Sequence, residues 1–84
     1  MLSYLLTCRS LTYAQRTARA LERNGIAAIV VRTPGEIAAG GCGYCVKIPE
    51  RRLSETLVTL KRNGLSPARI YMLYSDDSLT EVPV

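Results

Sequence analysis

Cysteine is the residue type best suited to chemistry in this chain of 84 residues, because histidine is absent from it. Without histidine, the sequence lacks the commonest general base near neutral pH and the commonest metal ligand. A four-coordinate zinc site would need a carboxylate or a second subunit in addition to the three cysteines. We therefore expect thiol chemistry without a bound metal or other cofactor. The cysteines are Cys8, Cys42 and Cys45.

Cys42 and Cys45 have the C-x-x-C spacing of redox dithiols, but their surroundings do not favour that role. Redox C-x-x-C motifs open a helix, which brings the sulfurs together, whereas residues 46–48 (VKI) are typical of a strand. Along a strand, the two Cα atoms would lie about 10 Å apart, which exceeds the span of a disulfide. Cys42 is therefore the candidate nucleophile. Its neighbours Gly41 and Gly43 would shape the loop so that backbone amides can approach the sulfur.

The other two cysteines carry weaker signals. Cys8 continues the inward alternation of Tyr4 and Leu6, which predicts a core thiol. Cys45 alternates onto the other face of its strand, where it would be a resolving thiol or a half-exposed neighbour. An odd number of cysteines, together with an N-terminus that lacks a basic leader, indicates reduced thiols in a cytoplasmic protein.

Short alternating or β-branched segments predict four strands, and a helix follows the first and the third. Thr12 and Gln15 match a capping box at the start of the first helix, and Pro49 fits the first turn of the second. An Asn-Gly pair stops each helix, because glycine adopts the left-handed cap conformation without a Cβ penalty. The predicted strands are 4–7, 26–31, 44–48 and 69–74.

The sequence repeats itself around the two helix ends. Residues 21–26 (LERNGI) return as residues 60–65 (LKRNGL). Two strand–helix–strand units predict an α+β, ferredoxin-like βαββαβ sandwich, with a four-stranded antiparallel sheet and two helices on one face. Residues 1–75 would form this single domain, and residues 76–84 a short acidic C-terminal tail that frays.

This topology would bring several chemistry-bearing side chains to one edge of the sheet. The first and third strands form its central antiparallel pair, so the end of the first lies beside the start of the third. The positive end of the first helix and the guanidinium of Arg9 would then favour the thiolate form of Cys42. The residues expected to gather around Cys42 are Cys8, Arg9, Ser10, Thr12, Gly41 and Gly43.

Four segments together resemble a family of small bacterial domains, the selenium/sulfur (Se/S) carrier protein-like domains. The segments, within a resemblance that covers residues 3–74, are 10–14 (SLTYA), 24–26 (NGI), 33–37 (TPGEI) and 41–43 (GCG). The resemblance implies that Cys42 accepts sulfur or selenium, as a persulfide or selenopersulfide passed between donor and acceptor proteins. The loop departs from the family pattern, because Gly35 replaces an arginine and Ala38-Ala39 replace two serines. Arg9 or Arg32 would have to compensate for the lost cation.

The charge of the chain keeps an alternative function open. Lys and Arg total 11 against 7 for Asp and Glu, a net charge of +4, which suits a small nucleic-acid- or protein-binding module of RNA-recognition-like topology without thiol chemistry. Tyr4 and Tyr44 lie on the strands where such domains carry stacking aromatics, but their alternation predicts that they face the helices. Nucleic acid is therefore not the expected partner. No acid–base pair for turnover is evident, so we expect a carrier and not an enzyme.

Apolar residues set two further expectations. The longest unbroken apolar run, residues 26–31, is too short to span a bilayer, so no membrane partner is expected. The sheet face opposite the helices would be open and apolar, and such a face is a candidate homodimer interface. Its residues would be Leu5, Ile29, Val31, Tyr71 and Leu73.

Overall fold

Strands and helices alternate along the chain in the structure, a computed structural model that describes residues 2–38 and 43–83. The two predicted helices and the four predicted strands are present, although the second strand begins at Ile29 and not at residue 26. The helices are α1 (Leu11–Arg23), α2 (Leu53–Arg62) and two short 3-10 helices, η1 (Gly35–Ile37) and η2 (Glu50–Arg52). The strands are β1 (Ser3–Thr7), β2 (Ile29–Arg32), β3 (Tyr44–Pro49), β4 (Arg69–Leu73) and β5 (Leu79–Val82).

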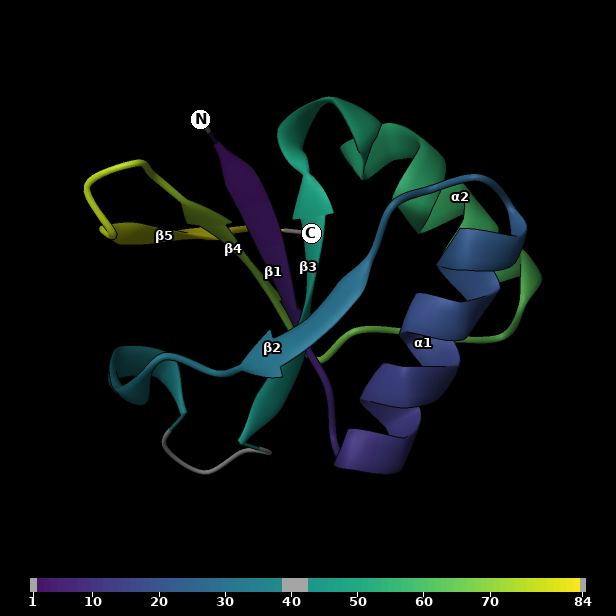
Figure 1. Cartoon of the computed structure of the whole chain (residues 1–84), viewed down its shortest axis with the longest axis horizontal. Helices are drawn as coiled ribbons and strands as arrows, with labels where there is room; N and C mark the ends of the chain where they lie inside the picture. The colour runs from purple at the N-terminus through teal and green to yellow at the C-terminus, as the bar shows by residue number, and fades with distance from the viewer. Residues whose placement is uncertain (1, 39–42, 84) are drawn as a thin grey trace.

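Within the described residues, the strands form one antiparallel sheet in the order β2-β3-β1-β4-β5 (Figure 1). β1 lies at the centre, with Thr7 opposite Cys45 of β3 on one side and opposite Arg69 of β4 on the other. The predicted antiparallel pairing of the first and third strands is therefore confirmed. The predicted count of four strands is wrong, because a fifth strand pairs with β4.

The fifth strand is formed by residues that we expected to fray. Ser78 donates from its backbone N–H and from its Oγ to Asp76 Oδ1, at 3.0 and 2.6 Å, and these hydrogen bonds lower the pKa of Asp76. Asp77 adopts a φ of 68°, which Asp tolerates better than most residues do. The turn brings Leu79 opposite Leu73. From the sequence we predicted a frayed acidic tail here and missed that Asp-Asp-Ser is also a turn signal.

Both helices cover one face of the sheet (Figure 1). Their buried side chains pack with alternate residues of β1 and β3, and this layer is the larger core. Leu21 of α1 and Leu60 of α2 are 0% and 1% exposed. The larger core contains Tyr4, Leu6, Cys8, Ala14, Ala18, Ala20, Leu21, Ile26, Ala28, Val46, Ile48, Leu60, Leu65 and Ile70.

The two helices end in the same way, as their shared L-x-R-N-G sequence predicts. At the end of α1, Gly25 N–H donates to the carbonyl of Glu22 at 3.0 Å, and Ile26 N–H donates to the carbonyl of Leu21 at 3.0 Å. The end of α2 repeats both hydrogen bonds from residues 64 and 65, at 3.2 and 2.9 Å. The φ angles of the two glycines are 77° and 67°, in the left-handed region that this cap requires. The repeat is therefore a duplicated helix stop.

The two helices begin differently, and both starts differ from the prediction. Ser10 caps α1 in place of Thr12, because its extended backbone lets its Oγ accept from Tyr13 N–H at 3.1 Å. Thr12 instead lies within the first turn of the helix. Pro49 is the last residue of β3 and precedes η2, so α2 begins at Leu53, without a side-chain cap.

Candidate functional site

The described residues of the predicted site lie where β1 ends and β3 begins. Thr7 and Cys45 are the last paired residues of these strands, and Cys8 and Arg9 follow Thr7 toward the start of β3. Thr7 also fixes this end of β1 to β4, because its Oγ1 accepts from Arg69 N–H at 2.9 Å. The first turn of α1 and the start of β3 lie at the same end of the molecule (Figure 1).

Gly41 and Cys42 lie outside the described residues. On one side of them, Ile37 of η1 packs against the sheet. On the other side, the carbonyl of Gly43 accepts from Thr33 N–H at 2.9 Å. A Cβ at Gly43 would meet no described heavy atom within 4 Å, so packing against the described residues does not require glycine at that position.

Cys8 is a core residue, as its alternation predicts. Its side chain is 3% exposed and lies in the larger core. Its thiol donates to the carbonyl of Leu6, with a sulfur–oxygen distance of 3.5 Å. A partner protein therefore cannot reach this sulfur without opening the core.

Cys45 is also buried, contrary to the half-exposed position that we considered for it. Its side chain is 0% exposed and belongs to a second, smaller core with Leu5 and Tyr71. Ile37 of η1 and Leu79 of β5 pack against this smaller core. The sheet face that we predicted to be open is therefore partly covered. The cover comes from a 3-10 helix and a fifth strand that alternation along the four predicted strands does not reveal.

Arg9 is held at the start of α1. Its guanidinium carbon lies 4.7 Å from the centroid of the Tyr13 ring, a geometry that stabilises a cation by about 0.5–1 kcal/mol at exposed sites. The Tyr13 hydroxyl accepts from Ser66 N–H at 2.7 Å, which ties this turn to the segment after α2. Arg9 and the exposed Ser10 thus directly precede α1, and the exposed Thr12 lies in its first turn.

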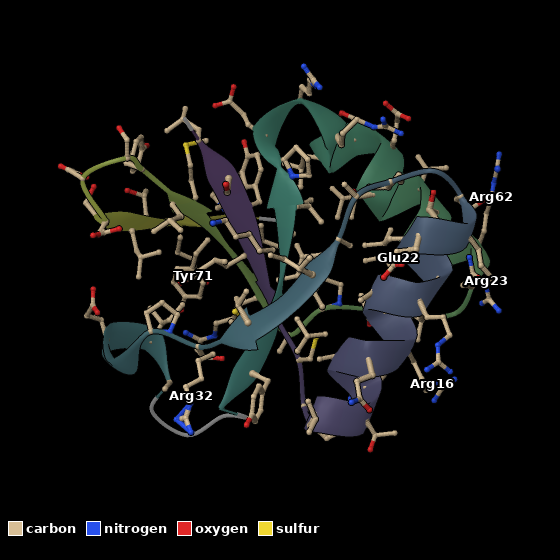
Figure 2. The ribbon with its side chains drawn as sticks, viewed as in Figure 1. Arg16, Glu22, Arg23, Arg32, Arg62 and Tyr71 are labelled. Carbon is tan, nitrogen blue, oxygen red and sulfur yellow. The ribbon has the colours of Figure 1, made fainter. Side chains whose placement is uncertain are left out.

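Arg32 is a second cation at this edge, which sequence reasoning considered only as a substitute for the missing loop arginine. It is the last residue of β2 and lies opposite Tyr44, the first residue of β3. Because β3 lies between β2 and β1, Arg32 and Arg9 flank the start of β3 from opposite sides. Figure 2 shows the Arg32 side chain at the end of the molecule where β3 begins. Its position at the end of a strand beside the third strand was the signal that could have identified it.

The opposite end of β3 contains a hollow with a volume of about 580 Å³. Neither Cys8 nor Cys45 lines it. Ile29 in its wall is 58% exposed, so part of the predicted homodimer surface remains accessible, and the dimer stays a prediction. The hollow is lined by Leu2, Ser3, Ala27, Ile29, Lys47, Ile48, Pro49, Glu50 and Arg51.

Two kinds of feature are not found in the described part of the chain. No group of three or more Cys, Asp or Glu side chains is placed so that it could hold a metal ion. No helix there is both long and apolar enough to cross a membrane.

A protein-family model described as "Putative Se/S carrier protein-like" matches residues 3–72. No curated protein and no solved structure matches the chain.

Proposed function

We propose that this chain, which belongs to the Se/S carrier protein-like family, holds sulfur or selenium on Cys42 and passes it from a donor protein to an acceptor protein. We also propose that β1–β4 and the two helices are a ferredoxin-like core, to which β5 adds one edge strand. The strand order and the placement of both helices on one face support this assignment.

The burial of the other two cysteines is the observation that carries the proposal. A carrier thiol must be reached in turn by a donor and by an acceptor. Cys8 is 3% exposed and Cys45 is 0% exposed, so neither can be approached while the cores are intact. Cys42 is the remaining cysteine of the chain and the one in the Gly-Cys-Gly segment.

The charges at this edge support an anionic sulfur. Arg9 and Arg32 flank the start of β3 from two sides, and α1, a helix of 13 residues, begins two residues after Arg9. The first turn of α1 contains no acidic residue that would oppose the positive end of the helix dipole. Both a thiolate and a persulfide anion are stabilised by such surroundings.

The transfer needs no external oxidant. The Cys42 thiolate attacks the outer sulfur of a persulfide on the donor, and a new sulfur–sulfur bond forms on Cys42 as the donor's sulfur–sulfur bond breaks. The donor cysteine leaves as a thiolate, and Cys42 becomes the persulfide. A donor selenopersulfide gives the selenium product by the same exchange. No protein disulfide forms, so the step requires neither buried cysteine as a resolving thiol.

Intact-mass spectrometry after incubation with a cysteine desulfurase and cysteine tests the proposal. We expect the mass to increase by one sulfur atom, with the adduct on Cys42, and we expect Cys42→Ser to abolish it. Cys8→Ala and Cys45→Ala are matched controls that remove a buried thiol, and both should keep the adduct. An adduct that persists in Cys42→Ser, or that never forms on the natural sequence, would contradict the proposal.

A further inference from the structure

The exposed cations of α1 lie in one line along the helix. Arg16, Arg19 and Arg23 are three and four residues apart, so they share one face. From Arg16 to Arg23 this line spans about 10 Å at the helical rise per residue. All three side chains are exposed, and Figure 2 shows Arg16 and Arg23 directed away from the sheet.

The end of α2 adds two more exposed cations, Lys61 and Arg62. Arg62 extends toward the same side of the molecule as Arg23 (Figure 2). We call Arg16, Arg19, Arg23, Lys61 and Arg62 the basic helix face. The ion pairs found among the described residues join Arg52 to Glu55 and Arg69 to Glu81, and therefore involve none of these five cations.

The acidic residues of the hairpin lie away from the basic helix face. Asp76 and Asp77 form the β4–β5 turn, and Glu81 lies on β5. Figure 1 shows this hairpin on one side of the molecule and the helices on the other. A charge distribution of this kind orients a molecule as it approaches an oppositely charged surface, and it raises association rates.

A protein surface fits the basic helix face better than RNA does. Domains of similar topology bind RNA by stacking bases on exposed aromatic residues of the sheet. Here Tyr4 is 9% exposed and packs in the larger core, and Tyr71 is 8% exposed and packs in the smaller core. The described sheet therefore offers neither of these two rings as a stacking platform, and Tyr44, the other candidate for stacking, is half-buried at the start of β3.

We propose that the basic helix face docks an acidic surface of the protein that delivers sulfur to this chain. This inference rests on the proposed function, because a carrier must bind the protein that delivers its sulfur. The line of arginines runs along α1, and α1 begins at the edge where Arg9 and Arg32 flank the start of β3. Arg16 is therefore the end of the line nearer to that edge, and a donor protein that covers the line must extend past the first turn of α1 to reach it.

Charge reversal at Arg16 and Arg19 tests the inference, with the doubly substituted Arg16→Glu/Arg19→Glu protein. With limiting cysteine desulfurase and cysteine at low salt, we expect persulfide formation to slow by about tenfold or more. We also expect added salt to slow the natural sequence while affecting the variant little. Lys47→Glu/Arg51→Glu is the matched control, because it makes the same charge change beside the hollow at the other end of β3 and should load normally.

A small donor separates this inference from the proposed function. Inorganic polysulfide needs no docking surface, so the natural sequence and the Arg16→Glu/Arg19→Glu variant should load from it equally. If the natural sequence loads from neither donor, the carrier function itself fails. Equal loading of the variant and the natural sequence by the desulfurase would overturn the docking proposal alone. So would salt-sensitive binding of single-stranded RNA that the variant loses while its sulfur loading stays normal.

Discussion

The two halves of this molecule end their helices alike and begin them differently. Leu21–Ile26 and Leu60–Leu65 form the same pair of hydrogen bonds around a glycine with positive φ. Thr17 and Thr56 also correspond, and both are buried in the two helices. In contrast, α1 begins on the side-chain cap of Ser10, whereas α2 follows a 3-10 turn and has no such cap. The shared helix ends lie next to the buried Leu21 and Leu60, whereas of the two different helix starts only that of α1 lies at the candidate site.

The duplicated leucines should give the largest effect. Leu21→Ala and Leu60→Ala each remove a side chain that is 0% or 1% exposed, so each should lower the free energy of unfolding by about 3 kcal/mol. Urea denaturation followed by circular dichroism measures both losses. Val58→Ala, at a side chain 53% exposed, is the control and should change little. If one leucine tolerates truncation and the other does not, the two halves are not equivalent in packing.

The duplicated glycines should give a smaller effect of purely conformational origin. A Cβ at Gly25 or Gly64 would meet no heavy atom within 4 Å, so an alanine there is not crowded. Its cost comes from φ angles of 77° and 67°, and Gly25→Ala and Gly64→Ala should each destabilise the fold by about 1–2 kcal/mol. Asn tolerates this region better, so Gly→Asn at either position should recover part of the loss. A loss for Gly→Asn as large as for Gly→Ala would show that strain at φ is not the cause.

Substitutions at the start of α1 should have the smallest effect on the free energy of unfolding. They also test whether Ser10 or Thr12 caps the helix. Ser10→Ala removes the oxygen that accepts from Tyr13 N–H at 3.1 Å and should cost about 1 kcal/mol. Thr12→Ala should leave the free energy of unfolding nearly unchanged, because Thr12 lies within the first turn. Equilibrium unfolding of the two variants in parallel gives the comparison. A larger loss for Thr12→Ala would restore the capping box that the sequence suggested.

Local signals predicted the parts of the fold that local forces determine. The Asn-Gly stops follow from the conformational freedom of glycine, and the structure has both of them. Alternation placed Cys8 in the core, because residues two apart on a strand share a face. The pairing of β1 with β3 followed from the order of the elements. Membership of the family was likewise evident from four short segments spread along the chain.

The predictions were wrong where the exposure of a residue depends on segments distant in the sequence, or where two nearby residues both suit the same role. Cys45 alternates onto the second face, as predicted, but its exposure depends on Ile37 and Leu79, which come from elements outside the four predicted strands. Ser10 and Thr12 are both good caps by residue type, and the backbone conformation at Ser10 decides between them. Cys42 lies outside the described residues, so its role still rests on the sequence, the family and the burial of the other two cysteines.

The hairpin that follows the second half also limits how the sheet can grow. Without β5, the outer backbone groups of β4 would be a template for another chain's strand, which is a common route to aggregation. β5 occupies those groups and presents a different rim, with a charged Glu81 that pairs with Arg69 at 3.8 Å. Pro83 follows at the end of β5 and has no N–H to donate. The last strand thus discourages the addition of a strand from another chain at this edge of the sheet.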